Sequence, residues 1–134
     1  MTPREFEKFA RERMSRHLGV QLKERSPAGF PKRFDLVSDD DGIVGDAKYL
    51  TLVGGLRQPP AKLMEITGHV WLLEKVAARQ RFLVFGNQRE VPEMWLRKYG
   101  RLPTNVEFYF LEPSGRVIDL RHDPTATTTN AGDI

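Results

Sequence analysis

Apolar residues recur at helical spacing in two separate parts of the chain. Near the N-terminus, Thr2 precedes Pro3 and stands three residues before Glu5, which is the sequence pattern of a helix N-cap with a capping box. Gly19 is suited to ending the helix. The apolar stripe between these signals consists of Phe6, Phe9, Ala10, Met14 and Leu18. The pattern predicts an amphipathic helix that begins at Pro3 and ends at Gly19.

A second stretch, "PPAKLMEITGHVWLLEKVAA" (59–78), repeats its apolar residues with the same period. Its stripe consists of Leu63, Ile66, Val70, Leu73 and Ala77. We therefore predict a second amphipathic helix in this stretch and a shorter helix near "PEMWLRKYG" (92–100).

Short segments with alternating or continuous apolar residues predict strands. "FLVFG" is continuously apolar, as expected of a strand that is covered on both faces. The predicted strands are residues 20–25, 33–38, 43–50, 82–86, 106–111 and 116–120. "DDDG" joins the second and third strands as a hairpin connection, and "EPSG" is a turn between the last two.

The order of these elements is helix, three strands, helix and strand, followed by a further helix and two strands. Such an order indicates an α/β fold with a mixed β-sheet flanked by helices. We expect residues 1–122 to form a single domain. Residues 123–134 ("DPTATTTNAGDI") lack an apolar pattern, so we expect a disordered polar tail.

Composition narrows the class of protein. With 134 residues, 40% apolar and 29% charged, the chain is long enough for one domain with a single core. No stretch approaches the roughly 20 apolar residues of a membrane helix, and the N-terminus is charged where a signal peptide would be apolar. The absence of cysteine excludes thiolate metal sites and a cysteine nucleophile. These features predict a cytoplasmic protein with no membrane partner.

Charge is distributed unevenly, although the net charge is only +3. Aspartates concentrate in "FDLVSDDDGIVGDAKYL" (34–50), and basic residues gather on both sides of this segment. The flanking basic residues are Lys23, Arg25, Lys32, Arg33, Arg57, Lys62, Arg79 and Arg81. A basic surface around an acidic pocket suits a phosphate-backbone ligand that is bridged by a cation. Ordinary solvated charges are the alternative.

The aspartates of this segment fall into two groups. Three of them, residues 39–41, precede Gly42 and are explained as turn formers. A calcium-binding EF-hand loop is excluded because Lys48 stands where that loop needs a glutamate. Asp35 and Asp46, in contrast, lie inside predicted strands, where aspartate is depleted and calls for a reason.

Antiparallel pairing places the charged strand residues close together. If Asp40–Asp41 is the two-residue loop, Asp35 faces Asp46. If Asp41–Gly42 is the loop, which is the stronger turn signal, Asp35 faces Lys48. In both registers one face consists of Asp35, Val37, Val44, Asp46 and Lys48, and the other of Phe34, Leu36, Ile43, Ala47 and Tyr49. Directly opposed residues lie about 4.5 to 5.5 Å apart at Cβ, so two carboxylates here can bind one cation.

"FD" at 34–35 and "DAK" at 46–48, preceded by a helix that contains "FEKFA", resemble the PD-(D/E)xK phosphodiesterase superfamily, the restriction-endonuclease-like nucleases. The common core of that superfamily, αβββαβ, matches the order predicted for residues 3–86, and the C-terminal αββ elements are additions. Phe34 stands where the superfamily name has a proline, a change that removes no ligand.

The resemblance implies a restriction-endonuclease-like core and a metal-dependent endonuclease that hydrolyses DNA phosphodiester bonds. It implies that Asp35 and Asp46 bind Mg²⁺ or Mn²⁺, with the Ala47 carbonyl as a third ligand, and that Lys48 positions the attacking water. The chemistry agrees, because this hydrolysis needs an in-line nucleophile and neutralisation of the developing negative charge. The alternative for Asp46 and Lys48 is a surface ion pair.

In the superfamily the first helix supplies a further carboxylate. At about 100° per residue, Glu7 falls beside the apolar stripe, whereas Glu5 and Glu12 point to solvent. Glu7 is also the glutamate of "FEKFA". We therefore expect Glu7 to bind the metal, directly or through water, or to orient Lys48. An ordinary surface glutamate is the alternative.

Several basic residues are candidates for contacts with nucleic-acid phosphates, namely Lys32, Arg33, Arg57 and His69. DNA is the expected partner, but RNA is open because a metal site contacts phosphate and not the sugar. A catalytically silent nucleic-acid or protein-interaction module with the same fold is the other alternative. A homodimer would pair two sites for two strands, and the C-terminal elements are the candidate interface.

Overall fold

In a computed structural model of the protein, which describes residues 1–51, 60–102 and 104–122, the chain forms an α/β fold. A six-stranded mixed sheet is flanked by three helices. The elements in chain order are α1 (Pro3–Leu18), β1 (Leu22–Arg25), β2 (Phe34–Ser38), β3 (Ile43–Leu50), α2 (Pro60–Glu74), β4 (Gln80–Asn87), α3 (Glu90–Tyr99), β5 (Val106–Leu111) and β6 (Val117–Asp119). The predicted fold class and order of elements are therefore confirmed at this level.

The strands lie in the sheet in the order in which they occur in the chain, from β1 to β6. β1, β2 and β3 form an antiparallel meander. β3, β4 and β5 are parallel, and β6 returns antiparallel to β5. The C-terminal elements thus extend the same sheet.

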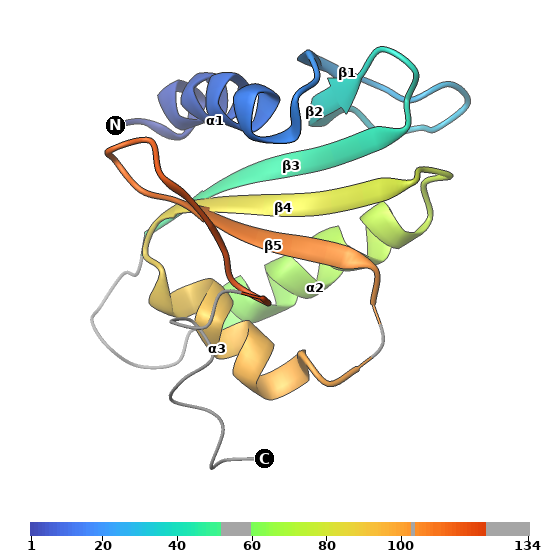
Figure 1. Cartoon of the computed structure of the whole chain (residues 1–134). Helices are drawn as coiled ribbons and strands as arrows, with labels where there is room; N and C mark the ends of the chain where they lie inside the picture. The colour runs from blue at the N-terminus through green and yellow to red at the C-terminus, as the bar shows by residue number, and fades with distance from the viewer. Residues whose placement is uncertain (52–59, 103, 123–134) are drawn as a thin grey trace.

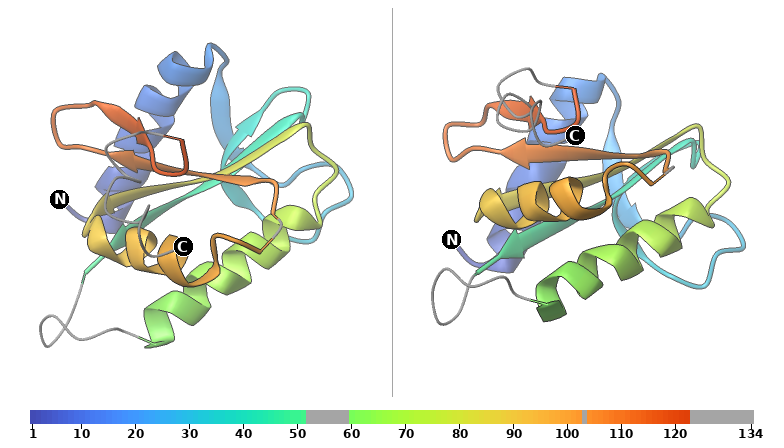
Figure 2. Two further views of the ribbon diagram at one scale, coloured as in Figure 1. Left: turned by 60° about the horizontal axis from the view of Figure 1, so that its bottom comes forward. Right: turned by 90° about the horizontal axis from the view of Figure 1, so that it is seen from below.

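The helices cover the two faces of the sheet unequally, as Figures 1 and 2 show: α1 lies on one face, and α2 and α3 lie on the other. Each face has its own buried cluster. The cluster under α1 includes Phe6, Met14, Leu36, Ala47, Phe82 and Val84. The cluster under α2 and α3 includes Phe34, Val44, Ile66, Leu83, Phe85 and Trp95.

α1 begins and ends as its sequence predicts. Thr2 Oγ1 accepts a hydrogen bond from the Glu5 backbone N–H at 3.1 Å, and the Glu5 carboxylate accepts one from the Thr2 N–H at 2.7 Å. Gly19 ends the helix with φ +70°, a left-handed conformation that favours glycine. Phe6 is buried against Gly86 of β4, where a Cβ atom would collide with the Phe6 ring. This close contact holds the N-terminal part of α1 against the C-terminal end of β4.

α2 is shorter than predicted, because it ends at Glu74 and not at residue 78. Its buried residues are Leu63, Ile66, Val70 and Leu73, which are the first four of the predicted stripe. The remaining predicted residue, Ala77, follows the helix. Arg57 and the tail 123–134 lie outside the described residues. Among the residues that are described, none of the helices has the length and apolarity needed to cross a membrane.

The β2–β3 connection settles the register that the sequence left open. Leu36 pairs with Gly45, so Asp35 stands opposite Asp46 and not opposite Lys48. The register given by an Asp41–Gly42 loop, the stronger sequence signal, is therefore wrong. The physical reason is a wider connection over residues 39–42, in which the Asp40 carboxylate accepts hydrogen bonds from the Ser38 hydroxyl at 2.8 Å and the Gly42 N–H at 2.9 Å.

Candidate functional site

The two strand aspartates interlock at the place where β2 and β3 separate. The Asp35 backbone N–H donates to Asp46 Oδ1 at 2.9 Å, and the Ala47 N–H donates to Asp35 Oδ2 at 3.0 Å. Each carboxylate therefore binds the main chain of the neighbouring strand, in place of the ladder bonds that continue further along. The two carboxylates are fixed as neighbours by this exchange.

A β-bulge in β2 sets the direction of the Asp35 side chain. The pairs on either side of the bulge are Lys23 with Val37 and Arg25 with Phe34. Asp35 and Leu36 together therefore lie opposite the single residue Glu24. Bulges of this kind bend a strand and redirect side chains, and they are frequent beside functional sites.

Because of the bulge, the side chains of β2 are distributed over the two faces of the sheet differently from the prediction. Leu36 packs in the cluster under α1, whereas Phe34 packs in the cluster under α2. Asp35 turns toward α1, while Asp46 and Lys48 extend from the face covered by α2. The prediction that Asp35 shares a face with Asp46 and Lys48, and Phe34 with Leu36, is wrong because it assumed strict alternation along β2.

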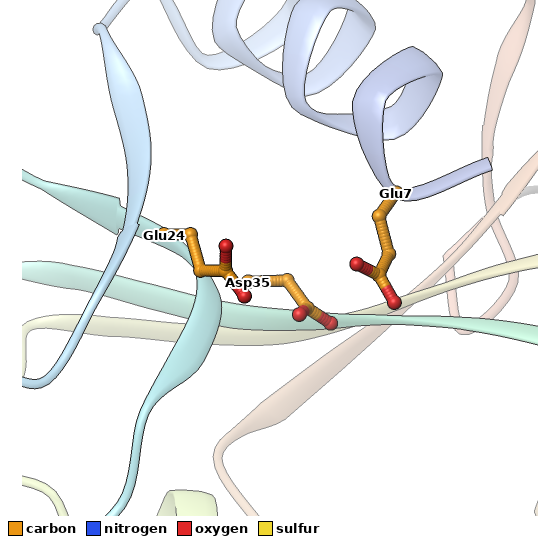
Figure 3. A group of neighbouring side chains, drawn as sticks. All are labelled: Glu7, Glu24 and Asp35. Atoms are coloured by element: carbon orange, nitrogen blue, oxygen red, sulfur yellow. The ribbon is translucent and has the colours of Figure 1, made fainter. Parts of the chain in front are cut away.

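Three carboxylates gather on the α1 side of the bulge. One oxygen atom from each of Glu7, Glu24 and Asp35 lies within 4.8 Å of the others, and all three side chains are half-buried. Figure 3 shows Glu7 descending from α1 and Glu24 extending from β1, with Asp35 between them. The helical position of Glu7 does bring it to the sheet, whereas Glu5 and Glu12 are exposed, as predicted.

Glu24 was missed in the sequence. Its strand "LKER" has a buried Leu22, and two residues later Glu24 extends from the same face, toward α1. The two-residue spacing from Leu22 indicates that Glu24 lies on the inner face of β1. Its proximity to Asp35 depends on the pairing of β1 with β2, which the sequence does not show. The Arg33 guanidinium lies 3.7 Å from the Glu24 carboxylate, so this predicted phosphate contact is also part of the group.

Asp46 is almost fully enclosed, with 4% of its side chain exposed. Its Oδ2 accepts a hydrogen bond from the Lys32 ammonium at 3.1 Å. His69 Nδ1, from α2, lies 3.4 Å from the same oxygen but makes no aligned hydrogen bond within the described residues. Lys32 and His69, predicted as phosphate contacts, both lie against Asp46.

The pKa values of the two aspartates are shifted in opposite directions. Burial raises the pKa of Asp35 to about 7, and the negative charges of Asp46 and Glu7 act in the same direction. Burial also acts to raise the pKa of Asp46, but His69, the Lys32 ammonium and the Asp35 N–H outweigh it and hold that pKa below its ordinary value. Asp46 is therefore the permanent anion of the pair, and Asp35 carries the unrelieved repulsion.

Lys48 is half-buried two residues after Asp46 on β3, and it pairs in register with Phe85 of β4. Phe85 belongs to the cluster under α2, so Lys48 and Asp46 share that face as predicted. Ala47, between them, is buried, and its N–H is the donor to Asp35. The roles predicted for Ala47 and Lys48 stay predictions.

The chemistry of the group suits a hard divalent cation. All its ligand atoms are oxygens, which Mg²⁺ and Mn²⁺ prefer. Glu7, Glu24 and Asp35 place three carboxylates within 4.8 Å of one another, and burial, together with the negative charges of Asp46 and Glu7, raises the pKa of Asp35. On the other side, a lysine ammonium already stands at Asp46. The residues thus fit a cation that would neutralise the cluster.

Comparisons of this chain with protein-family models, with curated proteins and with solved structures give no match. The residues of the chain and their arrangement are therefore the basis of the functional proposal.

Proposed function

We propose that this protein is a Mg²⁺-dependent nuclease that hydrolyses phosphodiester bonds in DNA. The observation that carries the proposal is the interlocked pair of Asp35 and Asp46 at the separation of β2 and β3. α1 and β1 add two further carboxylates to this pair. The two carboxylates repel each other, and a cation bound between them would remove that repulsion. Hydrolysis of a phosphodiester also needs a cation, which neutralises negative charge on the phosphate.

The order of elements supports the same reading. α1, β1, β2, β3, α2 and β4 follow one another as in the αβββαβ core that the resemblance implies, with the antiparallel meander followed by a parallel strand. We infer from this a restriction-endonuclease-like core. The aspartates and Lys48 stand on β2 and β3, and Glu7 on α1, which are the elements that the resemblance assigns to them.

In this proposal Asp35 and Asp46, with the Ala47 carbonyl, hold the cation between them where β2 and β3 separate, and Glu7 adds its carboxylate from the α1 side. The bound cation would supply positive charge to the non-bridging phosphate oxygens. Lys48 orients the attacking water and offsets negative charge that develops on the phosphate. Arg33, which is exposed beside the acidic group, contacts the nucleic-acid backbone.

The test is a cleavage assay with purified protein on duplex, nicked, branched and single-stranded DNA and on RNA, with Mg²⁺ or with EDTA. We expect cleavage of at least one DNA substrate that EDTA abolishes and that Lys48→Met reduces by about 10²-fold or more. Circular dichroism verifies that the variant is folded. Cleavage at the wild-type rate by the Lys48→Met protein would remove Lys48 from the mechanism, and cleavage of RNA alone would assign the substrate to RNA.

A catalytically silent binding module with the same fold is the second candidate. The observation in its favour is the ion pair between Lys32 and Asp46, because a lysine neutralises the buried carboxylate without any metal. Wild-type protein that binds DNA but cleaves none of the substrates with Mg²⁺ or Mn²⁺ would select this candidate.

A further inference from the structure

The ammonium of Lys32 lies in a site that is built for a cation. It donates to Asp46 Oδ2 at 3.1 Å and to the Arg33 carbonyl at 2.8 Å, and it lies 4.1 Å from the centre of the Phe34 ring. Carboxylate, carbonyl oxygen and aromatic face are three groups that attract positive charge. Although lysines usually extend into solvent, only 28% of this side chain is exposed.

The rest of Asp46 is already engaged. Its Oδ1 accepts the Asp35 N–H, and protein encloses the carboxylate almost completely. Oδ2, the oxygen that Lys32 and His69 contact, is the one that the Asp35 N–H leaves for a cation. Two positive charges within a few ångströms of one oxygen repel each other, so Lys32 and a divalent cation cannot both keep full contact with it.

We propose that Lys32 is an exchangeable counter-cation of Asp46: its ammonium holds the place of the divalent cation on Oδ2 and leaves when that cation binds. This inference rests on the proposed function and adds a regulatory step to the same site. The phenyl ring and the Arg33 carbonyl lie beside Lys32 in sequence, so they position its ammonium in the metal-free protein.

Thermodynamic linkage makes the proposal measurable. If Lys32 and the cation compete for one oxygen, the loss of the lysine charge strengthens cation binding. Cation binding in turn weakens the interaction between Lys32 and Asp46 by the same factor. A lysine that merely supports Asp46 gives the opposite result, because its loss would weaken cation binding.

The first measurement is the dissociation constant of Mn²⁺, by titration calorimetry on the full chain. We expect Lys32→Met to bind Mn²⁺ about tenfold more tightly than wild type, the size of one charge-assisted hydrogen bond after allowance for partial exposure. Lys23→Met is the matched control, because Lys23 is a β1 lysine that is paired with Asp39 of the turn at 3.9 Å. Its Mn²⁺ affinity should match that of wild type.

The second measurement follows Lys32 itself and separates displacement from a general effect of charge. Wild-type protein is treated briefly with an amine-reactive reagent, with and without saturating Mn²⁺, and the modification of each lysine is measured by mass spectrometry. We expect the Lys32 rate to rise several-fold with Mn²⁺ while the Lys23 rate stays constant. A Lys32 rate that is unchanged or lower with Mn²⁺ would overturn the exchange.

The outcomes separate this inference from the proposed function. Mn²⁺ binding to wild type that weakens in Lys32→Met overturns the exchange and leaves the nuclease proposal standing. Binding by Lys32→Met alone supports a lysine that blocks the site, and binding by neither protein overturns both proposals. Should Lys32→Met fail to fold, Lys32→Gln replaces it, and the labelling of wild type needs no variant.

Discussion

The two ends of the β2–β3 hairpin carry similar residues in opposite circumstances. At the turn, each aspartate has its own partners: Asp40 binds the Gly42 N–H, the Ser38 hydroxyl and the Arg79 guanidinium. At the other end, Asp35 and Asp46 lie against each other, with further carboxylates beside them. The same residue type therefore serves as a satisfied turn former at one end and, in Asp35, as a carboxyl whose negative charge is disfavoured at the other.

The contrast is visible in the direction of the pKa shifts. The hydrogen bonds from Gly42 and Ser38, together with Arg79, lower the pKa of Asp40, whereas burial and neighbouring negative charge raise the pKa of Asp35 to about 7. A carboxylate stabilised as an anion by its neighbours keeps its charge unaided, whereas the charge of one that is destabilised is relieved by a proton or by a bound cation. Acidic composition alone does not distinguish these cases; the partners do.

The largest expected difference between the two ends is in catalysis. Asp46→Asn should lower the rate of Mg²⁺-dependent DNA cleavage by about 10²- to 10³-fold, because the loss of a metal ligand removes several kcal/mol of transition-state stabilisation. Asp40→Asn at the turn should leave the rate unchanged. Single-turnover cleavage rates of the two variants test the comparison, and equal losses would show that the hairpin matters only for folding.

A pair of glycines compares how tightly the two ends are packed. A Cβ at Gly45, beside Asp46, would lie 2.5 Å from the Phe82 ring, which is buried and cannot move aside easily. A Cβ at Gly42 meets the end of the flexible Arg79 side chain. Gly45→Ala should therefore cost about 1 to 3 kcal/mol of unfolding free energy, and Gly42→Ala less than about 0.5 kcal/mol. Urea unfolding would measure both, and similar losses would contradict the comparison.

The raised pKa of Asp35 predicts a pH dependence of stability without metal. The unfolded chain releases this proton near pH 3.8 and the folded protein near pH 7, so between these values the folded state binds more protons. The free energy of unfolding then falls as pH rises through this window. After allowance for partial exposure we expect about 1 kcal/mol, or 3 to 5 °C in Tm.

The control for this effect is Asp35→Asn, which should lack it. The lowered pKa of Asp46 acts below the same window and leaves the comparison intact. Melting temperatures of both proteins in EDTA between pH 4 and pH 7.5 give the measurement. Parallel curves for wild type and Asp35→Asn would show that Asp35 is not strained by its neighbours.

The smallest effect is expected from Arg79→Ala at the turn. The Arg79 guanidinium lies 2.8 Å from Asp40, but both side chains are more than half exposed. Exposed ion pairs of this kind contribute little to stability, so neither Tm nor cleavage should change measurably. Differential scanning calorimetry tests this expectation. A clear loss of stability would mean that the turn, and not only the carboxylate pair, holds β2 and β3 together.

Much of the fold was predictable because its local signals agree. Thr2, Glu5 and Gly19 delimit α1, and the span of β3 matches its apolar pattern, 43–50. The end of α2 was less predictable, because apolar residues continue beyond Glu74 while the chain turns toward β4. Strand order was not predictable, since pairing depends on contacts between segments that are distant in sequence.

The candidate site was predictable in its members but not in its geometry. Glu7 follows from helical spacing, and Asp35 and Asp46 from the presence of charges in apolar strands. The orientation of Asp35 depends on the bulge, which arises from pairing with β1. The alternation of apolar and polar residues along β2 does not reveal such a bulge. Glu24 joins the group for the same reason, because only the bulged register sets it opposite Asp35.

Because the sheet order follows the chain order, each strand can pair with one that the ribosome has already released. The helix α1 and the meander of β1, β2 and β3 are complete at Leu50, before any residue of α2 has been synthesised. Lys32 and Asp46 both belong to the meander, whereas His69 reaches Asp46 only when α2 packs on the sheet. We therefore expect the meander to contain a counter-charge for Asp46 of its own, independent of α2.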